Sequence, residues 1–103
     1  MKVVKVQYTV KSGYAKRNSE NIARVMADVK KQHSNEIKYS TFLMDDNKSF
    51  VHFAILKNEE ANRLLNNLES FKTFQSELKA SMPETPPKLE NLSLVASSYE
   101  FFI

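Results

Sequence analysis

The stretch EIKYSTFLMDDNKSFVHFAIL, residues 36–56, decides the fold. Two runs rich in aromatic and β-branched side chains, 36–44 and 49–56, flank the polar residues 45–48. The short side chains of such a polar segment tolerate the dihedral angles of a tight turn. The stretch therefore predicts a β-hairpin. Its second run is apolar at both sets of alternating positions, so we expect both faces of that strand to contact protein.

The N-terminal third predicts a strand followed by a helix. Val4, Val6, Tyr8 and Val10 alternate with polar residues, which is the period of a strand with one apolar face. Ser12 and Gly13 end this strand. Apolar residues then recur at helical spacing and predict a helix over 16–33, with His33 at its C-terminal end, where an imidazole complements the helix dipole.

The C-terminal half predicts a second helix and a fourth strand. Asn58 is a suitable N-cap, and apolar residues continue at helical spacing to residue 82, with a break expected near Glu69. Pro83 ends the helix, because proline cannot continue the hydrogen-bond ladder. Residues 83–88 are expected to be an extended connector, and residues 89–99 a strand.

The resulting order is β-α-β-β-α-β. We expect one α+β domain over 1–103 with a ferredoxin-like fold, in which a four-stranded antiparallel sheet carries both helices on one face. If the helices cover Val51, Phe53 and Ile55, the open face of the sheet carries the alternate residues of that strand, Phe50, His52 and Ala54. An apolar open face needs a partner, and a second copy in a closed dimer is the commonest one. The C-terminal residues 99–103, four of them large and apolar, should also pack against protein, and we expect the partner subunit to cover them.

Composition excludes several functional classes. The 103 residues include no Cys and a single Gly, so thiolate metal sites, cysteine nucleophiles and Gly-rich phosphate loops are ruled out. The formal net charge is +3, yet only three cations are Arg and they are dispersed, which argues against nucleic acid as the partner. No apolar run approaches the ~18 residues of a membrane span, so we expect a cytoplasmic protein without a membrane partner.

The chain resembles the antibiotic-biosynthesis-monooxygenase-like group of dimeric α+β barrels. The likeness lies in the order and spacing of a Val-rich first strand ending at Val10–Gly13, the Asp45–Asn47 turn, Phe50–Phe53, Asn58–Ala61 and a Pro-rich approach to Leu89–Val95. The resemblance implies a homodimer whose sheets face each other. It also implies a pocket for a small aromatic or polyketide-like ligand, and oxidation of that ligand by molecular oxygen without metal or flavin.

His52 is the candidate catalytic residue. An imidazole on a central strand can titrate near neutrality and move a proton to or from a bound phenol or enol. We place His52 on the open face of the sheet, in a pocket with polar groups from the first strand, where Lys5 can stabilise an enolate. The predicted pocket residues are Lys5, Gln7, Thr9, Phe42, Phe50 and Ala54. The two His residues lie on different elements and do not form a metal motif.

Two alternatives remain open at this level. Where the family usually has an acid and a Trp in the third strand, this chain has Ala54 and Leu56, so a non-catalytic dimer that binds a small ligand is an alternative to an oxygenase. The same element order occurs in RNA-recognition modules, and Phe50–Phe53 matches half of their third-strand signature. The preceding residues 46–49 lack the basic and glycine positions of that signature, which makes RNA binding the remote alternative.

Overall fold

The computed structural model describes residues 1–32 and 35–102. The elements follow the predicted order, with one short addition and one split helix. They are β1 (Lys2–Thr9), η1 (Ser12–Tyr14), α1 (Ala15–Lys31), β2 (Ile37–Leu43), β3 (Ser49–Leu56), α2 (Glu59–Asn67), α3 (Glu69–Ala80) and β4 (Thr85–Leu92). The expectation for His33 lies outside the described residues.

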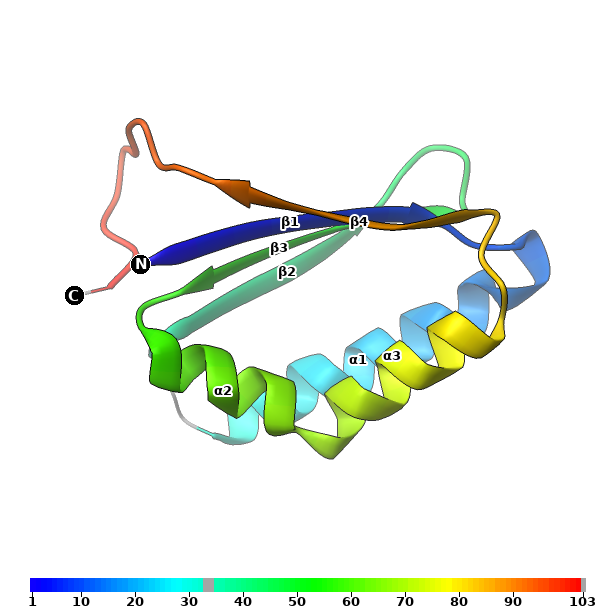
Figure 1. The fold of residues 1–103 in the computed structure, drawn as a ribbon, viewed down its shortest axis with the longest axis horizontal. Helices are drawn as coiled ribbons and strands as arrows, with labels where there is room; N and C mark the ends of the chain where they lie inside the picture. Colours follow the sequence, from blue (N-terminus) through cyan, green and yellow to red (C-terminus); the bar gives the residue numbers. More distant parts are fainter. Residues whose placement is uncertain (33–34, 103) are drawn as a thin grey trace.

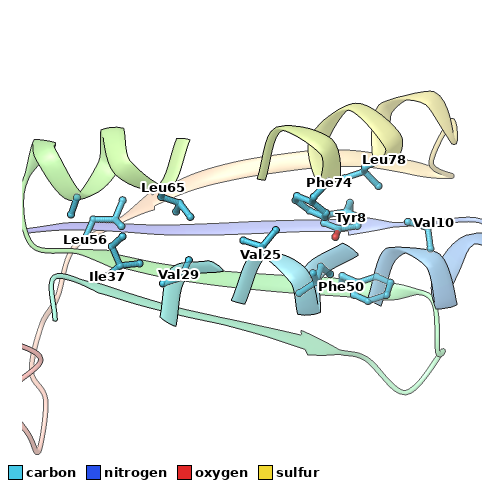
Figure 2. Close-up of a cluster of buried hydrophobic side chains, with 12 residues drawn as sticks. Tyr8, Val10, Val25, Val29, Ile37, Phe50, Leu56, Leu65, Phe74 and Leu78 are labelled. Carbon is cyan, nitrogen blue, oxygen red and sulfur yellow. The ribbon is translucent and has the colours of Figure 1, made fainter. Parts of the chain in front are cut away.

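The sheet has the strand order β2-β3-β1-β4, and every neighbouring pair is antiparallel. All three α-helices lie on one face of it, so the molecule has two layers (Figure 1). This arrangement confirms the predicted ferredoxin-like α+β fold. The core lies between the layers, where Tyr8, Val25, Phe50 and Phe74 are each at most 5% exposed (Figure 2).

The predicted turn and cap are both confirmed. Asn47 adopts a φ of 61°, a left-handed conformation that Asn tolerates better than most residues. Asn58 has an extended backbone, and its side-chain oxygen accepts a 2.9 Å hydrogen bond from the Ala61 amide. The expected break in the second helix is at Leu68, whose extended backbone (ψ 130°) ends α2 and starts α3.

The fourth strand begins earlier than the sequence predicted. β4 covers Thr85–Leu92 and includes two prolines, whereas residues 93–98 form neither helix nor strand and Val95 is 99% exposed. The prolines are accommodated because β4 is an edge strand with a register irregularity opposite residues 7–9 of β1. The alternation of apolar and polar residues after residue 92 therefore belongs to an exposed, irregular segment and not to a strand.

The C-terminal segment returns to the open face of the sheet. In Figure 1 it runs from the end of β4 back towards the N-terminal end of β1. Tyr99 and Phe101 line a hollow on this face together with Phe42, Phe53 and Ile55. Phe101 is half-buried, but Tyr99 remains 66% exposed. Phe101 thus packs partly within its own chain, whereas Tyr99 does not, and contact of the tail with a partner subunit stays a prediction.

Candidate ligand-binding site

The register of the central strands fixes which side chains face the helices. Val6 of β1 lies opposite His52 of β3, and Tyr8 lies opposite Phe50. Directly opposed residues share a face of an antiparallel sheet, so Phe50 and His52 lie on the helix side with Tyr8. The predicted orientation of this strand was therefore wrong: Phe53 and Ile55 lie on the open face, and His52 does not.

This inversion divides the predicted pocket residues between two faces. Lys5, Gln7, Thr9 and Phe42 lie on the open face, where Lys5 pairs with Glu90 at 3.9 Å. Phe50 belongs to the core, 2% exposed and stacked on Tyr8 with 5.7 Å between ring centroids. Only His52 and Ala54 line the cavity described next. The structure does not bring the predicted set together in one site.

A cavity of about 580 Å³ lies between the sheet and the helices α2 and α3. Its sheet wall includes Val4, Val6, Tyr8, Tyr39, His52, Ala54 and Leu56. Its helix wall consists of Leu65, Phe71, Phe74 and Leu78, with the half-buried Asn62 beside them. The exposed residues at its mouth include Asn66, Gln75, Lys79, Pro86, Pro87 and Leu89. Leu89 pairs with Val6 but is 60% exposed, so the helices leave the β4 side of this face uncovered. The cavity opens there.

The cavity wall contains a buried chain of hydrogen bonds through His52. The Asn18 side-chain amide of α1 donates to the Tyr8 hydroxyl over 2.8 Å, and that hydroxyl is 2.7 Å from His52 Nε2. On the other side of the ring, Nδ1 lies 2.7 Å from the Tyr39 hydroxyl and 3.0 Å from the Thr41 hydroxyl. Both ring nitrogens therefore have protein partners, and the imidazole is fixed in place.

Burial keeps all these groups uncharged. His52 is 4% exposed, and desolvation lowers its pKa from the usual 6.5 to about 4. Desolvation also raises the pKa of Tyr8 and Tyr39 far above the ordinary value for a phenol. At pH 7 the site thus presents a neutral imidazole and two protonated phenols, and His52 has no unoccupied nitrogen with which to take a proton from a ligand.

Aromatic rings surround this network. The His52 ring lies 5.3 Å from the Phe74 ring, and Tyr39 meets Phe71 edge to face at 6.3 Å. Phe71 and Phe74 contact each other at 6.0 Å. Such rings offer flat apolar surface with preferred edge and face contacts for another ring. The arrangement suits a small planar ligand with few polar groups.

Sequence reasoning missed Tyr39 and the two helix phenylalanines as site residues. The hairpin itself contained a signal for Tyr39, because a turn at 45–48 sets Tyr39 opposite Ala54 and Thr41 opposite His52, on one face. Phe71 and Phe74 showed only the helical spacing of core residues. A helix residue borders a cavity only if the helices leave part of the sheet uncovered beneath it. The hydrophobic periodicity of the sequence contains no information about that position.

Two further kinds of feature are missing from the described residues. Among residues 1–32 and 35–102, no group of three or more His, Asp or Glu side chains is placed to hold a metal ion. No helix within these ranges is long and apolar enough to cross a membrane.

The same architecture occurs in solved structures. One is a protein from Nitrosomonas europaea described as an antibiotic biosynthesis monooxygenase, with a TM-score of 0.76 and 15% identity over 93% of this chain and 100% of that one. Another is SnoaB from Streptomyces nogalater, described as a cofactor-independent oxygenase, with a TM-score of 0.70 and 19% identity over 96% and 98%. The chain has the same fold as these two proteins. A third neighbour, also described as an antibiotic biosynthesis monooxygenase and from Bacteroides thetaiotaomicron, has a TM-score of 0.79 at 9% identity, covering 96% and 93% of the two chains. The sequence matches no family model and no curated protein.

Proposed function

We propose that the protein binds a small, planar, largely apolar ligand in the cavity between its sheet and its helices. The observation that supports this most is the cavity itself: about 580 Å³ lies within the range of small-molecule sites, and its inner wall is aromatic and aliphatic. Its polar groups are few and are grouped at the tyrosines and at the mouth. This is the usual organisation of a pocket that takes an aromatic molecule.

The charge at the cavity restricts the ligand further. Its lining contains Lys2 and Lys79 and no Asp or Glu. An ammonium group at the mouth attracts an anion and repels a cation, while the apolar interior disfavours either charge. We therefore expect a neutral ligand, or one whose single negative group remains at the mouth.

A cavity-filling variant tests this proposal. Ala54→Leu adds side-chain volume at the cavity wall, and Ala96→Leu makes the same change in the exposed tail. With 1-ethylnaphthalene as the probe, an NMR titration should change the backbone amide chemical shifts of β1, β3 and α3 in the unmodified chain and in A96L. A54L should bind the probe much more weakly. Equal binding by A54L and A96L would contradict the proposal.

We further propose that the protein is a homodimer whose two open sheet faces meet. Phe42 and Phe53 contact each other edge to face at 6.2 Å on that face, and Phe42 is 57% exposed. Apolar surface of this kind on a sheet favours burial against a second, identical surface. Sedimentation equilibrium at micromolar concentration should give twice 11.9 kDa, and a mass of 11.9 kDa would reject the dimer.

Cofactor-independent oxygenation is the second candidate function. It is favoured by the likeness to SnoaB, although His52 has no unoccupied nitrogen to act as a base. With anthrone as the probe, the reaction would convert the substrate and one O₂ into anthraquinone and one H₂O. Measurement of O₂ consumption with an oxygen electrode separates the two candidate functions. Consumption that the unmodified chain accelerates and A54L does not supports an oxygenase. If the unmodified chain consumes O₂ no faster than the solution without protein, the protein only binds its ligand.

The remote RNA-binding alternative loses two of its candidate stacking groups. Phe50 and His52 are buried beneath the helices, and of the three rings in that signature only Phe53 lies on the open face. Base stacking needs rings that a nucleotide can reach. RNA affinity through this strand is therefore disfavoured by the orientation of its side chains.

A further inference from the structure

The buried hydrogen-bond chain from Asn18 to Tyr39 has a direction, and that direction determines what the cavity recognises. We propose that Tyr39 is the residue that donates a hydrogen bond to the ligand, and that His52 is the positioning residue that keeps its proton available. This rests on the proposed function, because it assigns a specificity-determining residue to the same cavity.

The Tyr8 hydroxyl donates its hydrogen bond in one direction only. Its oxygen accepts a hydrogen bond from the Asn18 amide, and the residue is 1% exposed, so no solvent can take the hydroxyl proton. A buried donor without an acceptor is costly. Among the described residues, the acceptor within reach is His52 Nε2 at 2.7 Å. Tyr8 therefore donates to Nε2.

The second step fixes the tautomer of His52. The ring is neutral, and a neutral imidazole carries one N–H and one acceptor nitrogen. Because Nε2 accepts, Nδ1 carries the hydrogen. The nearer oxygen available to it is that of Tyr39, at 2.7 Å, compared with 3.0 Å for Thr41. His52 thus donates to Tyr39.

The third step leaves the Tyr39 proton without a protein acceptor. Its oxygen accepts from His52 Nδ1, and desolvation by burial raises its pKa far above the usual range, although the neighbouring Thr41 hydroxyl acts to lower it. The phenol remains protonated, and its side chain lines the cavity. Among the described residues, the structure gives the Tyr39 hydroxyl a hydrogen bond with His52 Nδ1 alone, and that nitrogen already carries a hydrogen. The Tyr39 hydroxyl is therefore free to donate to a molecule in the cavity.

Such a donor selects for an acceptor oxygen on the ligand. In an apolar cavity, a ligand that leaves the phenol proton unpaired loses affinity relative to one that accepts it. A matched pair of probes shows the effect directly: 1-acetonaphthone carries a carbonyl where 1-ethylnaphthalene carries a methylene. We expect the unmodified chain to bind the ketone about tenfold more tightly than the hydrocarbon.

Binding of both probes to Tyr39→Phe, with Tyr99→Phe as the control in the exposed tail, tests the assignment. Y39F should lose about tenfold in affinity for the ketone and retain its affinity for the hydrocarbon, while Y99F should match the unmodified chain. If Y39F weakens both probes equally, or neither, Tyr39 is not the donor. If neither probe binds the unmodified chain, both the proposed function and this inference are wrong. If the unmodified chain binds the hydrocarbon as tightly as the ketone, only the inference is overturned.

The tautomer of His52 provides a test that needs no ligand. Nitrogen-15 spectra of the imidazole distinguish Nδ1–H from Nε2–H, and a His33→Gln variant identifies the His52 signals because the chain has only these two His residues. We expect Nδ1–H. Observation of Nε2–H would reverse the direction of every hydrogen bond made by His52, so that the Tyr39 hydroxyl would donate to Nδ1. That result would overturn the inference, whichever probe binds more tightly.

Discussion

Buried His52 should make the protein lose stability in mild acid. Its pKa is about 4 in the folded chain, and an unfolded chain leaves it near the usual 6.5. Between these values the unfolded state binds more protons, so the free energy of unfolding falls as the pH falls. The two values differ by about 2.5, and each unit corresponds to ~1.4 kcal/mol. The expected loss is therefore about 3.5 kcal/mol in total, of which about 2.5 kcal/mol is reached by pH 4.5.

Urea unfolding at pH 7 and pH 4.5, followed by circular dichroism, measures this loss. His52→Gln removes the titrating group, so its free energy of unfolding should change less between the two pH values than that of the unmodified chain. His33→Gln is the matched control and should keep the full loss. Hydrogen bonds from Arg17 and Asn21 lower the pKa of Glu77 to about 2, so this carboxylate also begins to lose its stabilising effect near pH 4.5, where it takes up protons in the unfolded chain. That contribution is common to the unmodified chain, H52Q and H33Q, so the difference between the variants isolates His52.

Two results would refute this reasoning. One is an equal loss of stability in the unmodified chain and in H52Q, which would show that His52 is not the group that titrates. The other is a His52 ring that titrates near pH 6.5 in the folded chain, observed by NMR. That result would mean that water reaches the imidazole and that the buried hydrogen-bond chain does not exist in solution.

Three further substitutions test the fold and the interface. Asn58→Ala removes the hydrogen bond that caps α2 and should lower the free energy of unfolding by about 1 kcal/mol. Met82→Gly should stabilise the chain by about 0.5–1 kcal/mol in urea unfolding, because Met82 has a φ of 55° and is 71% exposed; a decrease would show that this conformation carries no strain. Phe53→Asp lies on the open face, so the chain should fold yet sediment as a monomer, and loss of its circular dichroism would contradict that placement.

Local chemistry made most of the elements predictable. A polar turn between two aromatic runs, a capping Asn58 and an alternating first strand are each determined by residues close in sequence. The order of elements then left few antiparallel topologies, and the ferredoxin-like one is observed. The break at Leu68 was expected only approximately, because a single extended residue between two helices has no strong sequence signal.

The orientation of β3 was beyond local reasoning for a physical reason. Both alternating sets of its side chains are apolar, so the pattern that normally separates an inner from an outer face is lacking. What decides the orientation is the pairing of His52 with Val6, a contact between residues far apart in the chain. The candidate site depended on this choice: the inverted strand moved His52 from the predicted open face to the cavity beside Tyr39 and Phe74.

A crystal structure of the protein with 1-acetonaphthone bound tests the central claim most directly. The account predicts the naphthalene ring in the cavity between the sheet and α3, against Phe71 and Phe74, with its carbonyl oxygen within hydrogen-bond distance of the Tyr39 hydroxyl. A ligand bound instead on the open face beside Phe42 and Phe53, or a carbonyl directed away from Tyr39, would contradict it.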